Sequence, residues 1–264
     1  MTTRPGASPA STKHAMNIWN VCNGSQHVMP VAGTLHRLVE SQEQIATLNY
    51  VDTLEEQAML EDLLEQSKPP YPERARGYHY LLQTPFRYPP LQWGSRFGRV
   101  HEPSIFYGGL GLDPTLAESA YYRLVFWYSM PPHPTQASID SAHTLVSARY
   151  RSARGIQLHQ APFSAYEAAL THPADYAPAQ SLGSALREAG IDAFEYTSAR
   201  DIKKGRCVGL FTPTALSQKK PSSLSPWLCE TRADQVIFKP LSQNIVYRLP
   251  AEQFMIDGRL PRPA

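Results

Sequence analysis

A cation and a carboxylate that could act on one ligand lie in residues 87–118. Gly94 and Ser95 come directly before Arg96, and a Gly-Ser pair permits a tight turn that aims the next side chain inward. A guanidinium binds phosphate oxygens through two parallel hydrogen bonds. A carboxylate such as Glu118 can stabilise a positive charge that develops as a bond breaks. An Arg and a Glu at this spacing are more often surface groups. The surrounding sequence must therefore show whether they belong to one site.

Two expected elements would position these side chains. Residues 104–107 are β-branched and aromatic enough to form a strand, and the two glycines that follow would end it. Asp113 is a good N-cap and Pro114 a good first helical residue, which predicts a helix carrying Glu118 in its second turn.

The amino-acid sequence of these segments resembles that of the RES-domain family. The motifs that carry the resemblance are GSRFG, IFYGG and LAE, followed further along by GIDAFEYTSARD and VGLFTP. The family takes its name from an Arg, a Glu and a Ser, which match Arg96, Glu118 and Ser198 in order and approximate spacing. The resemblance covers roughly residues 35–214.

The resemblance implies an α+β fold related to the ADP-ribosyltransferases, with a core of small β-sheets flanked by helices. It implies an enzyme, a transferase that consumes NAD⁺ as a substrate rather than holding a cofactor. The expected reaction is phosphorolysis, with inorganic phosphate as co-substrate and with nicotinamide and ADP-ribose 1″-phosphate as products. The resemblance also implies a toxin of a toxin–antitoxin system, controlled by an antitoxin or immunity protein that covers the active site.

Residue roles follow from the same resemblance. Glu118 would stabilise the oxocarbenium-like transition state, and Arg96 would hold the pyrophosphate together with a second arginine. Arg37 is the best match for that second arginine, and Arg87 is the alternative.

Four further side chains are candidates for the same site. Tyr107 could stack on the cationic nicotinamide ring, or it could be core packing at a strand end. Ser198 could receive a phosphate or the nicotinamide amide. Arg200 and Arg206 could neutralise the incoming phosphate, or they could be solvated loop charges.

Two other functions remain open. The same cleft could serve a mono-ADP-ribosyltransferase that modifies a protein, or an NAD glycohydrolase that uses water. The chain could instead be a non-catalytic interaction module whose long helix, expected over residues 43–65, docks a partner.

Composition excludes several classes. The chain of 264 residues has 25 Lys and Arg against 23 Asp and Glu, a net charge of +2 that makes no electrostatic case for nucleic acid binding. No apolar run is long enough for a transmembrane helix. The glycines after the expected strand do not form a Rossmann fingerprint, and no GxSxG elbow surrounds Ser198.

Cysteine and histidine spacing predicts no metal site. Cys22, Cys207 and Cys229 lie far apart, and no HExxH or CxxC pattern occurs. The sparse cysteines fit a reducing cytoplasm, either of the producing cell or of a target cell if the protein is delivered as an effector.

The chain divides into three expected parts. Residues 1–30 are expected to be a mobile arm, residues 31–216 the catalytic domain with a helical insertion at 41–68, and residues 217–264 an extension packed on the same domain. The helix within the insertion would pack on the core or offer a partner or homodimer surface.

Further elements are expected from periodicity and turn residues. A hairpin is expected with its turn at residues 152–155. The remaining expected strands are 31–39, 193–196, 207–211, 236–238 and 245–247, and the remaining expected helices are 166–170 and 177–189.

Overall fold

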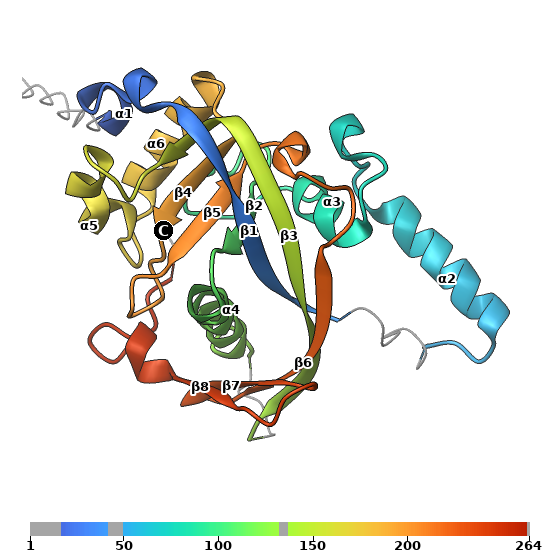
Figure 1. The fold of residues 1–264 in the computed structure, drawn as a ribbon. Helices are drawn as coiled ribbons and strands as arrows, with labels where there is room; N and C mark the ends of the chain where they lie inside the picture. Colours follow the sequence, from blue (N-terminus) through green and yellow to red (C-terminus); the bar gives the residue numbers. More distant parts are fainter. Residues whose placement is uncertain (1–16, 42–49, 132–136, 263–264) are drawn as a thin grey trace, which may run out of the picture.

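Eight strands and several helices build the α+β fold that was expected (Figure 1). The computed structural model describes residues 17–41, 50–131 and 137–262. The strands form one sheet in the order β1-β2-β5-β4-β3-β6-β7-β8. Their bounds are β1 Met29–Glu40, β2 Phe106–Gly109, β3 Ile139–Gln157, β4 Ala193–Thr197, β5 Arg206–Leu210, β6 Ser223–Thr231, β7 Gln235–Pro240 and β8 Tyr247–Pro250.

The sheet closes on itself because β1 pairs with β3 as well as with β2. The strands β1, β2, β5, β4 and β3 therefore form a ring, and β6, β7 and β8 extend from the other edge of β3. All of these pairings are antiparallel except β3 with β4. Strands that could have formed separate small sheets are thus joined through β3, which spans 19 residues.

The expected hairpin at residues 152–155 is wrong, because β3 runs through it without turning. Ser152 and Gly155 pair with Val31 and Met29 of β1, across a register irregularity in that strand. A Cβ atom at Gly155 would lie 2.2 Å from Val31 Cγ2. The glycine therefore serves a close approach between strands, not a turn.

Helix α4 (Leu112–Trp127) lies in the concave side of the sheet (Figure 1). Its buried residues pack with Trp227 of β6 and Phe238 of β7 in one apolar cluster. The helix begins at Leu112 with Gly111 as its N-cap, so Asp113 is a first-turn residue and not the expected cap. Pro114 is tolerated there because the first N–H groups of a helix have no intrahelical acceptor.

A second apolar cluster covers the other face of β4 and β5. Helices α5 (Glu167–Leu170) and α6 (Ala177–Glu188) pack there, with Phe97 and Phe194 fully buried between them. A further helix, α3 (Tyr80–Arg87), covers one end of the ring through Leu82 and Phe86.

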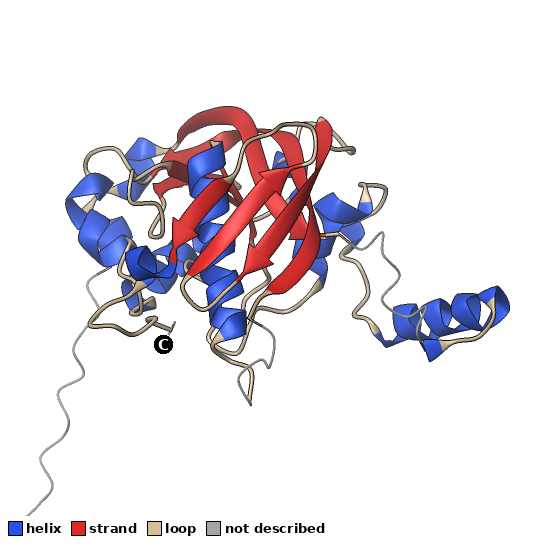
Figure 2. Ribbon diagram, turned by 90° about the horizontal axis from the view of Figure 1, so that it is seen from below, coloured by secondary structure: helices blue, strands red, loops and turns tan. Residues whose placement is uncertain are grey.

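Helix α2 (Leu54–Ser67) stands away from the rest of the molecule (Figures 1 and 2). It begins at Leu54, with Thr53 as its N-cap, rather than at residue 43; residues 42–49 lie outside the described part. Met59 and Leu63 are 66% and 57% exposed. The expectation that this helix packs on the core is therefore wrong, and a partner surface remains open.

The two ends of the chain contribute to the fold. Helix α1 (Ile18–Val21) buries Ile18 and is followed by a short 3₁₀ turn, so the expected mobile arm is wrong for residues 17–30; residues 1–16 lie outside the described part. At the other end, β6 pairs with β3 along nine residues. The sequence analysis missed this strand because serines and a proline interrupt its apolar pattern.

Candidate active site

A pocket of about 640 Å³ opens between α4, strands β1 and β2, and the segment that follows α3. Its volume falls in the range typical of small-molecule and cofactor sites. The side chains that line it include Arg37, Arg96, Tyr107 and Glu118 of the predicted set. The pocket therefore brings together four of the eight predicted site residues.

One face of α4 forms a wall of this pocket. The lining residues on the helix are Thr115, Glu118, Ser119, Tyr122, Arg123 and Phe126. They recur at the three- and four-residue spacing that places side chains on a single helical face. Glu118 and the residues beyond it therefore share one continuous wall.

Ser198 holds the carboxylate of Glu118. It follows the last residue of β4, and its hydroxyl donates to Glu118 Oε1 at 2.6 Å. The same Oγ accepts hydrogen bonds from the backbone N–H groups of Arg200 and Asp201, both at 3.2 Å. Ser198 is 3% exposed and does not line the pocket. Its hydroxyl is thus engaged in orienting Glu118, behind the pocket wall.

Arg96 joins the turn that carries it to the α5–α6 connection. Its Nη1 donates to the carbonyl oxygens of Leu170 and His172 at 3.2 and 2.9 Å. The guanidinium lies 4.3 Å over the ring of Tyr176, and its Nη2 has no hydrogen-bond partner among the described residues. Arg96 therefore lines the pocket and also holds the α5–α6 connection in place.

The turn before Arg96 has the tight geometry expected from its sequence. Gly94 has φ +76°, and a Cβ there would lie 2.4 Å from the carbonyl oxygen of Gly98. Tyr107 Oη accepts the N–H of Phe97 at 3.0 Å and hydrogen-bonds Ser95 Oγ at 2.9 Å. Burial raises the pKa of Tyr107 to about 12, so the phenol keeps its proton. Tyr107 lines the pocket while its hydroxyl holds the turn.

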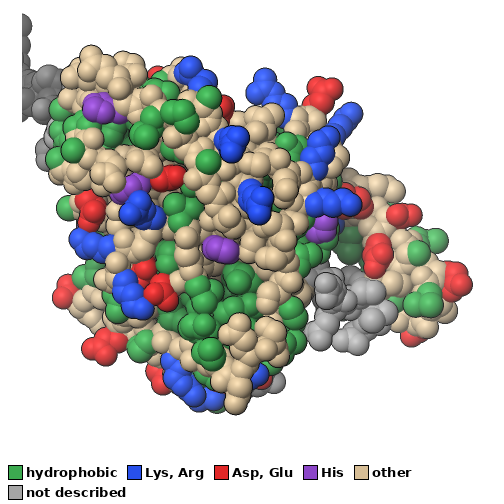
Figure 3. All heavy atoms as spheres, in the orientation of Figure 1, with side chains coloured by type: hydrophobic (Ala, Val, Ile, Leu, Met, Phe, Trp, Pro, Cys, Tyr) green, Lys and Arg blue, Asp and Glu red, His purple; other side chains and the backbone are tan. Residues whose placement is uncertain are grey.

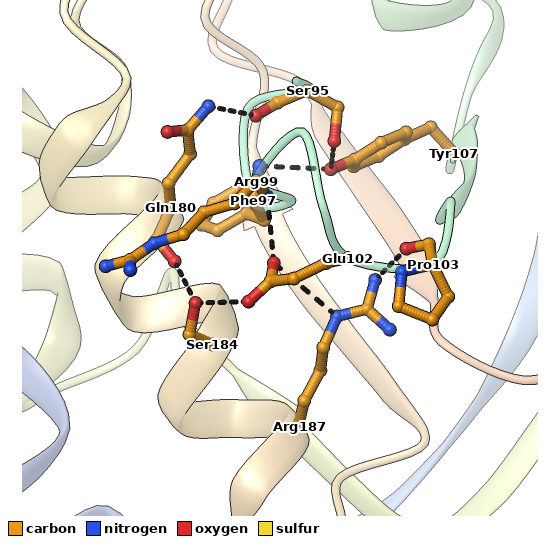
Figure 4. A network of polar contacts seen from close by, with 9 residues as sticks. All are labelled: Ser95, Phe97, Arg99, Glu102, Pro103, Tyr107, Gln180, Ser184 and Arg187. Atoms are coloured by element: carbon orange, nitrogen blue, oxygen red, sulfur yellow. Dashed lines mark hydrogen bonds and ion pairs between the residues drawn. The ribbon is translucent and has the colours of Figure 1, made fainter. Parts of the chain in front are cut away.

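Helix α6 holds the same loop from the other side (Figure 4). Gln180 Nε2 donates to the carbonyl oxygens of Trp93 and Ser95 at 3.0 and 3.1 Å. Glu102 accepts from Ser184 Oγ, while Arg187 lies 3.9 Å from Glu102 and donates to Pro103 O. The loop from Trp93 to Pro103 is therefore clamped to α6 at both of its ends.

Arg37 is a desolvated cation at the pocket. Burial lowers the pKa of its guanidinium, and Nη1 donates to the Tyr107 carbonyl oxygen at 3.2 Å. Within the described residues it forms no ion pair, whereas Arg123 in the same wall is paired with Glu40. A half-buried cation without a carboxylate partner is suited to an anionic ligand.

Arg87 lies outside the pocket lining. It pairs with Glu65 at 2.7 Å, donates to the Pro69 carbonyl oxygen, and stacks 4.0 Å over the ring of Tyr71. These contacts fix the C-terminal end of α2 to the body. Of the two arginines left open by the sequence, only Arg37 reaches the pocket.

The two arginines after Ser198 also lie outside the lining. Arg200 is 4% exposed, donates to Pro173 O and Tyr176 Oη, and lies 3.4 Å over the ring of Tyr121. Arg206 is exposed beside His159. Arg200 is thus a strut between α4 and the α5–α6 connection, and neither guanidinium faces the pocket.

The pocket residues that lie beyond Glu118 on α4 were not predicted from the sequence. Tyr122 and Phe126 follow Glu118 at four and eight residues, and Arg123 lies between them. That helical spacing was the available signal, because a helix that shows Glu118 to a cleft also shows the residues one and two turns later.

The carboxylate that Ser198 holds and the guanidinium of Arg37 line one pocket, and this arrangement could accept a small anionic ligand. Residues 71–231 match the RES domain, and the chain belongs to that family, as its motifs predicted. Among solved structures it is similar to a chain of the M. tuberculosis MbcT-MbcA toxin-antitoxin complex, with 11% identity, a TM-score of 0.45 and coverage of 79% of this chain and 91% of that one. This similarity is distant, and no curated protein matches the chain.

Neither a metal centre nor a membrane-spanning helix is found in the described residues. They contain no group of three or more His, Cys, Asp or Glu side chains placed to hold a metal ion. Within the same residues, no helix has the length and apolar character needed to cross a membrane.

Proposed function

We propose that this protein cleaves the bond between nicotinamide and ribose in NAD⁺, with inorganic phosphate as the acceptor. The observation that supports it best is the hydrogen bond of 2.6 Å between Ser198 Oγ and Glu118 Oε1, at the wall of a pocket that Arg37 also lines. A fixed carboxylate and a cation with an unused charge match the sugar and the pyrophosphate of a dinucleotide.

The reaction would proceed at C1″ of the nicotinamide ribose. The bond from C1″ to the nicotinamide nitrogen breaks, and its electron pair neutralises the pyridinium ring. Positive charge develops on the ribose, where the Glu118 carboxylate stabilises it. A phosphate oxygen then forms the new bond to C1″, which gives nicotinamide and ADP-ribose 1″-phosphate.

Arg37 and Arg96 would bind the pyrophosphate. A guanidinium suits this task because its donors are held in a planar fork. Neither guanidinium forms an ion pair among the described residues, and Nη2 of Arg96 has no hydrogen-bond partner there, so both charges could serve an anionic ligand. Tyr107 would contribute by keeping the Arg96 turn in place.

Family membership supports the choice of phosphate over other acceptors, and no contact in the pocket adds to that support. Arg200 and Arg206, which could have held phosphate, do not line it. Water and a protein side chain are therefore the outcomes against which the phosphate proposal is tested.

We also propose that the protein is a toxin, kept inactive by an antitoxin or immunity protein that covers the pocket. Denying NAD⁺ entry is the direct way to stop such an enzyme. A homodimer through the exposed face of α2 belongs to the same proposal, with cytoplasmic NAD⁺ as the target.

The test is a mass-resolved product assay of purified protein with NAD⁺, in the presence and absence of inorganic phosphate. The proposal predicts ADP-ribose 1″-phosphate only when phosphate is present. Free ADP-ribose without regard to phosphate would identify a glycohydrolase, and mass added to a protein would identify a mono-ADP-ribosyltransferase. If purified protein released no nicotinamide under any of these conditions, the proposal would be wrong.

A further inference from the structure

We propose that Tyr122, Phe126 and the Arg123–Glu40 pair form a subsite for the adenosine half of the dinucleotide. The inference rests on the proposed function, because it assigns the end of the pocket that the bond-breaking chemistry does not use. It names the substrate class as adenine dinucleotides without a 2′-phosphate on the adenosine ribose.

Two aromatic side chains of α4 are partly exposed inside the pocket. Tyr122 and Phe126 line the pocket, and they are 40% and 51% exposed. Their neighbours on the opposite face of α4, Tyr121 and Leu124, are fully buried in the core. Core packing therefore does not account for the two rings, which offer flat apolar surface within a cavity, as stacking on a base requires.

Tyr122 lines the pocket together with Arg37. Burial raises its pKa well above the ordinary value although part of its surface is accessible. Its hydroxyl is close enough to Arg37 to act on the pKa of that guanidinium. The ring thus lies beside the cation expected to hold the pyrophosphate.

The order of groups along α4 matches the order of groups in a dinucleotide. Phe126 is eight residues beyond Glu118, which corresponds to about 12 Å along a helix at about 1.5 Å per residue. Glu118 would act at the nicotinamide ribose, Arg37 beside Tyr122 would meet the pyrophosphate, and Phe126 would meet the second base. A ligand with one base would leave this end of the pocket empty.

The Arg123–Glu40 pair fixes the edge of the subsite. Arg123 Nη1 lies 3.0 Å from Glu40 Oε2, its Nε donates to Thr231 Oγ1 at 3.1 Å, and its guanidinium lies 5.5 Å over the Phe126 ring. Both Glu40 and Arg123 line the pocket. Glu40 is the more exposed member of the pair, with its side chain 63% exposed against 12% for Arg123, so a ligand meets the carboxylate first. The carboxylate can accept hydrogen bonds from ribose hydroxyls, and it would repel a phosphate on the 2′ oxygen.

The test compares Phe126→Ala with Phe126→Trp and with Tyr80→Ala. Tyr80 is also an exposed aromatic residue, 42% exposed, but it does not line the pocket. Binding of ADP is measured by calorimetry, and turnover is measured with NAD⁺, NADP⁺ and nicotinamide mononucleotide. ADP reports on the subsite even if the protein cleaves no bond.

Phe126→Ala should weaken ADP binding about ten- to a hundredfold, the range for losing one base–aromatic stack. It should raise KM for NAD⁺ by a similar factor, with kcat unchanged, and should leave turnover of nicotinamide mononucleotide as it is in the unmutated protein. Phe126→Trp should restore ADP binding, and Tyr80→Ala should change neither quantity. NADP⁺ should be the poorer dinucleotide, and Glu40→Gln should narrow that difference.

The possible failures are distinguishable. Loss of ADP binding in Phe126→Ala without any NAD⁺ turnover would support the subsite and refute the proposed function. Normal turnover with unchanged ADP affinity and unchanged KM in Phe126→Ala would refute the subsite and leave the function standing. Absence of ADP binding to the unmutated protein would also refute the subsite.

Discussion

Ser198 illustrates how the structure refines a role taken from sequence resemblance. Its hydroxyl was expected to meet phosphate or nicotinamide, but it donates to Glu118 and accepts two backbone N–H groups. We therefore expect Ser198 to influence the reaction through the carboxylate that it orients. This arrangement explains why a buried serine would be needed beside a pocket that it does not line.

Replacing Ser198 by Ala should lower kcat more than it raises KM. The Glu118 carboxylate would lose the donor that fixes it, and two buried N–H groups would lose their acceptor, at about 1–3 kcal/mol for a buried unsatisfied group. Steady-state kinetics and thermal unfolding measure the two effects, with Ser223→Ala on the exposed start of β6 as the control. An unchanged kcat would show that Ser198 does not position Glu118.

Substitutions of Arg37 and Arg87 should have different effects on ADP affinity and on stability. Arg37→Ala should weaken ADP binding about tenfold or more, because it removes a charge-assisted contact worth about 1.5–3 kcal/mol. Arg87→Ala should leave ADP affinity unchanged and lower the melting temperature, since Arg87 fixes the end of α2 to the body. Calorimetry and thermal unfolding of both variants provide the measurement, and the reverse pattern would contradict the assignment.

At the scale of elements, α4 and α6 divide the work of the site. Helix α4 carries Glu118 and the pocket wall, while α6 clamps the loop that carries Arg96 (Figure 4). The clamp uses both backbone carbonyl groups and the Glu102 carboxylate. The loop therefore needs no regular secondary structure of its own to hold its shape.

Gln180→Ala should loosen this loop without unfolding the protein. Two backbone carbonyl oxygens lose their donor, so residues 93–103 should exchange amide hydrogens faster and KM for NAD⁺ should rise a few-fold. Hydrogen exchange and kinetics test this against Gln26→Ala, an exposed glutamine in the first 3₁₀ turn. Unchanged exchange in the loop would mean that Gln180 does not clamp it.

Local signals predicted the elements whose shape depends on neighbours in sequence. The strand of Arg37, the turn at Gly94 and the helix of Glu118 all follow from their own residues. The predicted hairpin at residues 152–155 is wrong because Gly155 packs closely against Val31, which is far away in the sequence. Arg87 failed as a site residue for the same reason, since Glu65 and not a ligand engages its guanidinium.

At the scale of the whole molecule, the surface combines mixed charges with one projecting helix that exposes apolar side chains. On the face drawn in Figure 3, basic and acidic side chains are interspersed and form no single basic stripe. Helix α2 precedes the residues matched by the family, carries acidic side chains and exposes Met59 and Leu63. The RES domain and this projecting helix are thus separate features of one chain.

The stability of the whole molecule should fall on mild acidification. His143 is 3% exposed, and burial, with Arg123 nearby, lowers its pKa below the ordinary value of 6.5. His143 therefore binds a proton near pH 6.5 in the unfolded chain, whereas in the folded chain it binds one only at lower pH. The free energy of unfolding should be constant with respect to this group above that pH and decrease below it.

Urea unfolding at pH 7.5 and pH 5.5 measures this loss, with His143→Gln as the comparison. The difference between the two pH values should be smaller in the variant than in the unmutated protein. It should not vanish, because burial also lowers the pKa of His36 and His159. An identical difference in both proteins would contradict the role of His143.

The most direct test of the account is NAD⁺ cleavage by Glu118→Gln, measured as nicotinamide release with phosphate present. The glutamine keeps the size of the side chain and can still accept the Ser198 hydroxyl, but it removes the charge that stabilises the ribose cation. We predict a loss of about a hundredfold or more in kcat, corresponding to about 3 kcal/mol, with ADP affinity retained. Equal turnover in Glu118→Gln and the unmutated protein would show that the reaction does not take place at this carboxylate.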